Sequence, residues 1–202
     1  MIIFVSGATK SLKRHRCAEL GQLMTPQDGN LYRGEEMLVA VDNCAYSNWN
    51  EDKFIKLLDS LIGKNVVWVA APDVVGNASE TSMLYDDRWY EEIKIKRGLP
   101  IAYVAQDGMD WIGNPANDFD CLFIGGTTEF KLGGYVRYAV QSAKEHGKWV
   151  HMGRVNSLLR LRYAMRIGCD SIDGSGFSIA PEEKIPVFVK AIRGETRQVA
   201  MW

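Results

Sequence analysis

Val66-Val67-Trp68-Val69-Ala70-Ala71-Pro72-Asp73 is a short apolar run that ends in a proline and an aspartate. A helix that crosses a bilayer needs about 20 apolar residues, so this run is far too short to be one. Its β-branched and aromatic residues favour a strand, and a strand that is apolar on both faces is typical of a parallel sheet covered by helices. The run therefore predicts a buried strand with a polar end.

Six more runs along the chain share this pattern of an apolar stretch that ends in Asp, Gln, Gly or Asn. They begin at Ile2, Leu38, Ile101, Cys121, Trp149 and Asp170. Between the runs lie segments with the spacing of an amphipathic helix, such as Phe54–Ile62, where apolar residues recur every three or four positions. The other predicted helices are Tyr135–Ala143, Ser157–Arg166 and Ile185–Ile192. Alternation of strands and helices predicts an α/β protein with a parallel sheet.

Two α/β architectures fit this alternation, a doubly wound sheet and a barrel. The segment Ser6–Ser11 after the first strand matches neither glycine-rich phosphate-binding fingerprint that a doubly wound sheet commonly carries. Polar residues instead end almost every strand, as at the C-terminal face of a barrel. These residues are Asp42, Asp73, Gln106, Gly125, Gly126 and Asp173. The sequence thus predicts a compact, single (β/α) TIM-type barrel over residues 1–202, with seven recognisable strands and an eighth that is cryptic or missing.

The composition limits the partners and the setting of the protein. Lys and Arg number 24 against 25 Asp and Glu, so a polyanion would have to be held by a local basic patch. The four cysteines lie far apart without a metal-binding spacing, which favours reduced thiols and a cytoplasmic protein. We expect no metal and no cofactor. The N-terminal run resembles neither a secretory signal nor a membrane anchor.

Convergence of carboxylates on one rim of a barrel indicates a catalytic site. A single Asp at a strand end is more often a helix cap or a turn former, but several together have little structural purpose. The three histidines form no Ser/His/Asp pattern, and no strand-end lysine indicates a Schiff base. The remaining chemistry is that of two carboxylates, one acting as nucleophile and one as acid or base.

Six motifs, taken in order, resemble those of the queuine-type tRNA-guanine transglycosylases, and especially their short viral relatives that place 7-deazaguanines into DNA. The motifs at Asp42–Tyr46 and Pro72–Asp73 are similar to the family's segments for proton transfer and base recognition. Those at Val104–Gly108, Phe123–Gly126 and His151–Gly153 are similar to its later strand ends, and Gly168–Gly174 resembles the segment that carries its nucleophile. The resemblance covers about residues 37 to 178.

The resemblance implies a role for each matching residue. Asp173 would attack the sugar as the nucleophile, and Asp42 would move a proton between the outgoing and incoming bases. The base would be held by Asp73, Gln106, Gly125, Gly126, Tyr46 and Met152, with the Gly126 N–H as a donor and the last two stacking on its faces. The implied enzyme is a pentosyltransferase that replaces guanine with a preQ0-like or preQ1-like 7-deazaguanine. It would work through a covalent aspartyl-sugar intermediate that retains configuration.

The sequence departs from the tRNA enzymes in ways that favour DNA over tRNA as the polymer. It lacks their Cys/His zinc module, and its chain is shorter. The replacement of their Ser-Gly-Gly by Asn43-Cys44-Ala45 concerns instead the pocket wall and the base substituent. Basic side chains near the rim are expected to contact backbone phosphates, although a solvated helix face is an equally common reason for such runs. These are Lys10, Lys13, Arg14, Arg16, Arg154 and Arg160. A partner protein or a homodimer would help such a small enzyme to reach a base in a duplex.

Three other functions stay open at this stage. The chain is alternatively an enzyme of the same kind that acts on RNA, or a barrel that positions nucleic acid without catalysis. Retention of both Asp42 and Asp173 argues against the second of these, because a binding subunit needs neither. A barrel lyase or aldolase for a small molecule is the remaining class, and a basic rim would argue against it.

Overall fold

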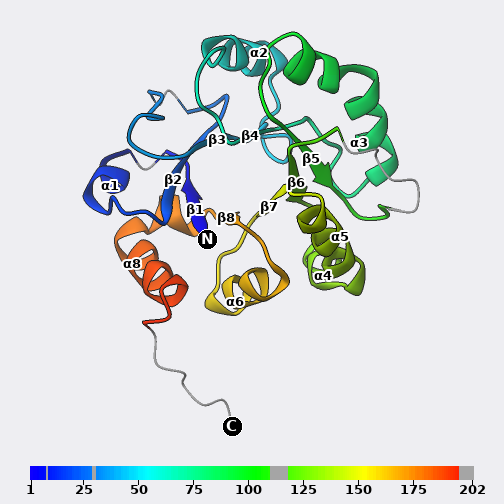
Figure 1. Ribbon diagram of the computed structural model, residues 1–202. Helices are drawn as coiled ribbons and strands as arrows, with labels where there is room; N and C mark the ends of the chain where they lie inside the picture. The colour runs from blue at the N-terminus through cyan, green and yellow to red at the C-terminus, as the bar shows by residue number, and fades with distance from the viewer. Residues whose placement is uncertain (8, 29–30, 110–117, 196–202) are drawn as a thin grey trace.

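Eight parallel strands close into a barrel in the computed structural model, which describes residues 1–7, 9–28, 31–109 and 118–195. Each strand pairs with the next along the chain, and the last pairs with the first. Figure 1 shows the strands in a central ring with the helices outside it. The strands are β1 (Ile2–Val5), β2 (Leu20–Met24), β3 (Val39–Val41), β4 (Trp68–Ala70), β5 (Ile101–Ala105), β6 (Cys121–Ile124), β7 (Trp149–Met152) and β8 (Ser171–Asp173). The predicted TIM-type barrel is confirmed.

Helical segments connect the strands and cover the outside of the barrel. They are α1 (Thr9–Arg14), α2 (Glu51–Ser60), α3 (Ala78–Leu84), the π-helical η1 (Tyr85–Trp89) and η2 (Glu91–Ile95), α4 (Thr128–Leu132), α5 (Gly134–Glu145), α6 (Leu158–Ile167), α7 (Gly176–Ile179) and α8 (Pro181–Ile192). Local chemistry sets several of these ends. The Asn50 side chain accepts a hydrogen bond from the Lys53 N–H at the start of α2, and Gly168 ends α6 with φ of 99°.

Within the described residues, no helix combines the length and the apolar character that crossing a membrane requires.

The strand that the sequence pattern did not reveal is β2. All five of its residues are buried, yet it contains a glycine and a glutamine, which a search for apolar β-branched runs passes over. Gln22 lies in the strand without penalty because its side chain donates to the Leu31 carbonyl at 2.9 Å and accepts from the Arg33 N–H at 3.0 Å. At Gly21, a Cβ atom would lie 2.5 Å from the Phe4 ring, so only glycine leaves room for that ring. The eighth strand is therefore present, and tertiary packing explains its composition.

Two layers of apolar side chains fill the molecule. Alternate strand residues point out against the helices, where they form the larger core, and the others fill the barrel. The barrel interior combines the large rings of Phe4, Trp68 and Phe123 with the small side chains of Ala40, Ala70 and Ala102. Phe4 and Phe123 each meet Trp68 edge to face, with ring centroids 5.5 and 5.6 Å apart. This interior is a packed core, as is typical of a TIM barrel.

Closure of the barrel places the end of β8 beside β1. Ile3 pairs with Ile172, and Phe4 pairs with Asp173. Asp173 is the last residue of β8 and shares the inward face with Ser171. The carboxylate at the end of the last strand therefore reaches the same mouth as the polar ends of β3, β4 and β5.

Candidate active site

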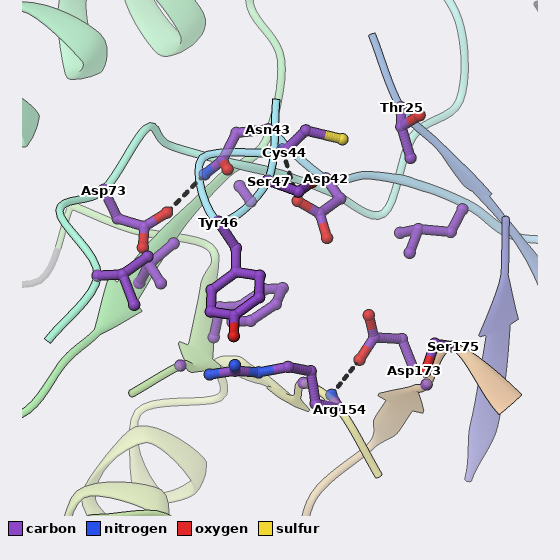
Figure 2. Close-up of a pocket in the computed structure, with 18 of the residues that line it drawn as sticks. Thr25, Asp42, Asn43, Cys44, Tyr46, Ser47, Asp73, Arg154, Asp173 and Ser175 are labelled. Carbon is purple, nitrogen blue, oxygen red and sulfur yellow. Dashed lines mark hydrogen bonds between the residues drawn. The ribbon is translucent and has the colours of Figure 1, made fainter. Parts of the chain in front are cut away.

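A cavity of about 390 Å³ opens at the C-terminal ends of the strands. Its volume lies within the range of small-molecule sites. Eight of the residues singled out by the sequence line it, and Figure 2 shows several of them around the opening. They are Asp42, Tyr46, Asp73, Gln106, Gly125, Gly126, Arg154 and Asp173. Residues from β3, β4, β5, β6, β7 and β8 thus contribute to one pocket.

Asp42 follows β3, and its pKa in this pocket is higher than that of an ordinary aspartate. Its Oδ1 accepts a hydrogen bond from the Cys44 N–H at 2.9 Å. Although its side chain is partly open to the pocket, the surrounding protein disfavours its charged form, and the negative charge of Asp173 adds to this effect. Together they raise the pKa of Asp42 to about 6. Asp42 can therefore hold or release a proton near neutral pH, as a general acid or base requires.

Asp173, across the pocket, has the opposite electrostatic balance. Burial by itself raises the pKa of this carboxyl, but the nearby His151, the Arg154 N–H and the Lys131 charge outweigh burial and hold the pKa below its usual range. The Arg154 N–H donates to Asp173 Oδ1 at 2.5 Å. His151 Nε2 lies 3.8 Å from the same oxygen, which is too far for a hydrogen bond. Asp173 is consequently the ionised member of the pair, which suits a nucleophile.

His151 is a buried residue beneath Asp173 to which the sequence assigned no role. Its ring is fully buried in the barrel, 4.6 Å from the ring centroids of both Trp68 and Phe123. Nδ1 lies 2.9 Å from the Ser171 hydroxyl, and burial lowers the pKa of the imidazole despite the nearby Asp173 charge. Strand periodicity offers the signal that would have found it, since His151 and Asp173 both point inward from neighbouring strands.

Each of the two carboxylates is held by a residue in left-handed backbone conformation. In the described part of the chain, Cys44 and Arg154 are the residues other than glycine with positive φ, at 61° and 60°. Such a conformation is unfavourable for a residue with a Cβ atom. Both turns aim a backbone N–H at a carboxylate, Cys44 at Asp42 and Arg154 at Asp173. The backbone strain is thus concentrated at the two groups proposed to react.

Asp73 lies between two hydrogen-bond donors, Asn43 and Gln106, on the β4 and β5 side of the pocket. Asn43 Nδ2 donates to its Oδ1 at 2.9 Å, and Gln106 Nε2 donates to its Oδ2 at 2.6 Å. Burial raises the pKa of Asp73 even though both hydrogen bonds oppose the shift. Each carboxylate oxygen keeps a further lone pair for a ligand. Gln106, whose Oε1 also accepts from the Gly76 N–H at 2.9 Å, acts first as the support of Asp73.

Tyr46 and Arg154 meet at the pocket opening, where Figure 2 shows the ring beside the guanidinium group. The Arg154 Cζ lies 4.5 Å from the centre of the exposed Tyr46 ring. Arg154 Nη2 also donates to the Gly126 carbonyl at 2.7 Å. These contacts fix a planar aromatic group at the mouth, where a flat ligand can stack on it.

The two glycines after β6 are required by their surroundings. A Cβ atom on Gly125 would lie 2.8 Å from Gln106 Nε2 and 2.9 Å from the Ala105 carbonyl. Gly126 has φ of 71°, and a Cβ atom there would lie 2.6 Å from Asp107 Oδ2. Their absence of side chains keeps this wall of the pocket low enough for a ligand to approach the backbone.

Met152 does not lie where the resemblance places it. Its side chain is buried in the layer between the barrel and the helices, because Met152 alternates with the inward-pointing His151 along β7. It does not line the pocket. The prediction that Met152 packs on one face of the base is therefore corrected. Among the pocket residues, Phe4, Tyr46 and Phe123 supply the aromatic surfaces.

The basic run after β1 lies outside the pocket. None of Lys10, Lys13, Arg14 and Arg16 lines it. Arg14 forms an ion pair with Glu182 at 2.6 Å, and Arg16 approaches Glu36 at 3.9 Å. Acidic neighbours thus compensate two of the four charges, while Arg154 lies at the pocket itself. Contact of the run with phosphates stays a prediction.

Lys131 of α4 is a pocket residue that the sequence analysis missed. Its side chain is buried and its Nζ donates to the Gly153 carbonyl at 2.6 Å. Burial, together with the Arg154 charge, lowers the pKa of Lys131 to about 8. The sequence pattern passed over Lys131 because this lysine lies on α4 rather than at a strand end, and it lines the pocket from that helix. Within the described residues, no group of His, Cys, Asp and Glu side chains gathers as a metal site would.

Known proteins share the fold of this chain. No known family profile matches the sequence, and no curated protein matches it. A solved structure described as "Native KDPGal structure" has a TM-score of 0.61 at 11% sequence identity, over 96% of this chain and 94% of that chain. The Bacillus subtilis YkuI protein, with an EAL domain and in complex with c-di-GMP and calcium, has a TM-score of 0.41 at 15% identity, over 79% of this chain and 45% of that chain. At 11% identity, the first of these structures shows a common barrel fold and leaves the activity open.

Substitution of Cys44 tests the strained turn. Cys44→Gly should keep or raise the melting temperature, because glycine adopts positive φ without strain, whereas Cys44→Val should lower the free energy of unfolding by about 1 to 3 kcal/mol. Thermal unfolding followed by circular dichroism measures both. Ala45→Gly is the matched control, since this neighbour has ordinary φ and glycine should destabilise it by about 0.5 to 1 kcal/mol. Equal effects of the two glycine substitutions would contradict strain at Cys44.

The raised pKa of Asp42 makes a prediction for stability. A carboxyl whose pKa rises from 3.8 when unfolded to about 6 when folded costs no stability below pH 4, and its cost grows as the pH rises to about 6. Asp42→Asn should therefore melt at a higher temperature than the native protein above pH 6 and at a similar temperature near pH 4. Melting curves across this range measure the difference. A gain that does not change with pH would show that the Asp42 charge is not its source.

Proposed function

We propose that the protein is an enzyme that exchanges a base at an N-glycosidic bond of a nucleic acid, replacing guanine with a 7-deazaguanine such as preQ0 or preQ1. The observation that carries this proposal is the pair Asp42 and Asp173, which share one pocket but have pKa values shifted in opposite directions. Two titratable groups whose environments separate their pKa values are the signature of a divided acid and nucleophile role. The proposed reaction class is pentosyl transfer.

The reaction proceeds in two balanced steps. In the first, a carboxylate oxygen of Asp173 forms a bond to the sugar C1′ while the bond from C1′ to the guanine nitrogen breaks, and the proton on Asp42 passes to the departing base. In the second, a nitrogen of the incoming 7-deazaguanine attacks C1′ and displaces the Asp173 carboxylate. Asp42 accepts the proton that the incoming base loses. Two inversions at C1′ retain its configuration.

The surroundings of Asp173 favour the first step. The Arg154 N–H binds one oxygen of the carboxylate and fixes its direction. The positive charge that develops on the sugar is stabilised by the ionised Asp173 itself. The lowered pKa of this group keeps it ionised at neutral pH, at which Asp42 retains part of its protonation.

Asp73 supplies the means to recognise guanine. Guanine presents adjacent N–H donors on one edge, and a carboxylate accepts two such donors at once. Asn43 and Gln106 hold the Asp73 carboxylate in place, so its direction is set before the base arrives. Tyr46 offers the stacking surface at the mouth, and the Gly126 N–H offers a donor to the base carbonyl.

We infer DNA as the polymer, following the resemblance to the viral enzymes that modify DNA. A base within a duplex has to be extruded before it can enter a pocket of this kind, at a cost of a few kcal/mol. In this proposal, Arg154 at the mouth and the neighbouring Arg160 contact the backbone of the polymer. Action on tRNA is the other outcome of the same experiment.

The test is transfer of label from a radiolabelled 7-deazaguanine into polymer. Single-stranded DNA, duplex DNA and an anticodon stem-loop of tRNA are incubated with the native protein under identical conditions. Label in DNA supports the proposal, and label in the stem-loop alone would change the polymer to RNA. Binding of base and polymer without any transfer would indicate a non-catalytic binding protein.

Asp173→Asn should abolish base exchange and leave base binding within a few fold of native. An amide is not a nucleophile toward C1′, whereas its size and its contact with the Arg154 N–H are preserved. Label transfer and the covalent protein-polymer species on a denaturing gel are measured for the native and variant proteins. Near-native transfer by the variant would show that another group attacks the sugar.

Asp73→Ala should weaken guanine binding by about ten- to a hundredfold. The donors on the base edge lose their acceptor, and an unpartnered buried polar group costs about 1 to 3 kcal/mol. Calorimetric titration with guanine and adenine compares the two bases for the native and variant proteins. Equal affinity of the native protein for both bases would be inconsistent with recognition by Asp73.

A second candidate function rests on Lys131. A buried amine in the pocket with a pKa of about 8 suits a carbonyl lyase that works through a Schiff base. Borohydride would then reduce the Schiff base between Lys131 and a small keto acid or aldehyde to a stable covalent adduct. Lys131→Met would prevent formation of this adduct. The two carboxylates of opposite pKa shift favour base exchange over this function.

A further inference from the structure

Three cationic side chains converge on one side of the pocket mouth. Lys131 comes from α4, Arg154 from the turn after β7, and Arg160 from α6. Lys131 and Arg154 line the main pocket, and all three line a small cavity that adjoins it. The three side chains belong to separate elements, so tertiary structure alone brings them together.

Neutral groups hold all three cations. Lys131 Nζ donates to the Gly153 carbonyl at 2.6 Å, and Arg154 Nη2 donates to the Gly126 carbonyl at 2.7 Å. Arg160 Nη2 donates to the Thr128 hydroxyl at 2.8 Å. None of the three forms an ion pair with a carboxylate in the described part of the chain. Most of their N–H donors therefore remain available.

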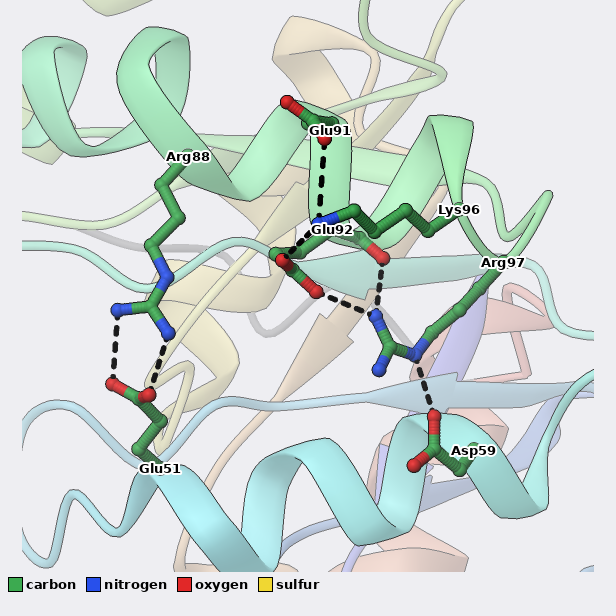
Figure 3. A network of polar contacts seen from close by, with 7 residues as sticks. All are labelled: Glu51, Asp59, Arg88, Glu91, Glu92, Lys96 and Arg97. Carbon is green, nitrogen blue, oxygen red and sulfur yellow. Dashed lines mark hydrogen bonds and ion pairs between the residues drawn. The ribbon is translucent and has the colours of Figure 1, made fainter.

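An arginine that is withdrawn from water elsewhere in the molecule, Arg97, is paired with carboxylates. Figure 3 shows the network between α2 and the η1–η2 segment, where each cation faces a carboxylate. Arg97, whose side chain is only 11% exposed, pairs with Asp59 at 2.8 Å and with Glu92 at 2.9 Å. A cation withdrawn from water ordinarily needs such a partner. In the ranges of the chain that the structure describes, no carboxylate forms such an ion pair with the cluster at the pocket.

We propose that Lys131, Arg154 and Arg160 together bind one phosphate group, that of the nucleotide whose sugar faces Asp173. This inference rests on the proposed function and adds to it a specific subsite with Lys131 at its base. The main chain of Arg154 binds Asp173 while its side chain belongs to the cluster, so the phosphate site adjoins the nucleophile. When C1′ of a nucleotide faces Asp173, the phosphate of that nucleotide is separated from C1′ only by the sugar ring.

Electrostatics around Lys131 agree with this placement. Its pKa is lowered to about 8 by burial and by the charges of Arg154 and Arg160, against the opposing effect of Asp173. A phosphate between the three groups removes the mutual repulsion of the cations. Charge-assisted hydrogen bonds to phosphate from guanidinium and ammonium groups are among the strong polar contacts of proteins.

Calorimetric titration of the full chain tests the subsite. The probes are deoxyguanosine, its 5′-monophosphate, its 3′-monophosphate and inorganic phosphate. One of the two nucleotides should bind about tenfold or more tightly than the nucleoside, and inorganic phosphate should compete with that nucleotide. Arg160→Gln should remove most of the tenfold preference while leaving deoxyguanosine binding within about twofold, and Lys131→Met should remove the same preference.

Arg162→Gln is the matched control, because Arg162 is an exposed arginine on the same helix α6 and lies outside the pocket. It should keep the preference for the nucleotide. Equal affinity for nucleoside and nucleotides, failure of all four probes to bind, or equal losses in the Arg160 and Arg162 variants would each overturn the subsite. A preference for the nucleotide without label transfer would support the phosphate subsite and contradict base exchange. Label transfer without that preference would support base exchange and contradict the subsite.

Discussion

The pairing of β1 with β8 closes the sheet, and the arrangement of the pocket depends on this closure. It aligns Phe4 with Asp173, so the last strand delivers its carboxylate to a mouth already bordered by the ends of β3, β4 and β5. Without closure, β1 and β8 would be the two edges of an open sheet, and Asp173 would have no opposing Asp42. The aromatic rings and alanines packed in the barrel interior form the floor of the pocket, so the pocket does not continue as a channel through the barrel.

Two negative groups in one pocket repel each other, and the protein resolves this through asymmetric surroundings. The hydrogen bond from the Cys44 N–H does not offset the burial of Asp42 and the negative charges of Asp173 and Asp73, so Asp42 protonates easily. Asp173 has a backbone donor and the fields of His151 and Lys131, so it stays ionised. Both backbone donors come from turns in a left-handed conformation that costs stability. Strain and electrostatics thus act on the same two residues, and both serve the division of roles between them.

The repeated strand ends made much of the site predictable before any coordinates were known. In a barrel of parallel strands, a residue that ends a strand has to lie at one rim, so Asp42, Asp73, Gln106 and Asp173 were expected together. Met152 fails this reasoning because neighbouring residues of a strand point to opposite faces, and a shift of one position turns a pocket residue into a core residue. The same reasoning did not identify Lys131, because this residue lies on α4 and its position at the pocket depends on the path of the chain after β6. The sequence pattern did not identify strand β2, because it contains Gly21 and Gln22. These two residues suit a strand only through their contacts with Phe4 and with residues 31–33, which a local pattern cannot show.

The amino-acid sequence by itself determined the alternation of strands and helices, the barrel class and the carboxylates that end its strands, because periodicity and strand ends are local properties. The tertiary structure decided which carboxylate is the acid and which is ionised, because a pKa depends on burial and on charges contributed by other elements. It also decided that Gln106 supports Asp73, that Met152 lies outside the pocket, and that Lys131, Arg154 and Arg160 form one cationic cluster. These relations join residues far apart in the chain, and only the closed barrel sets the distances between them.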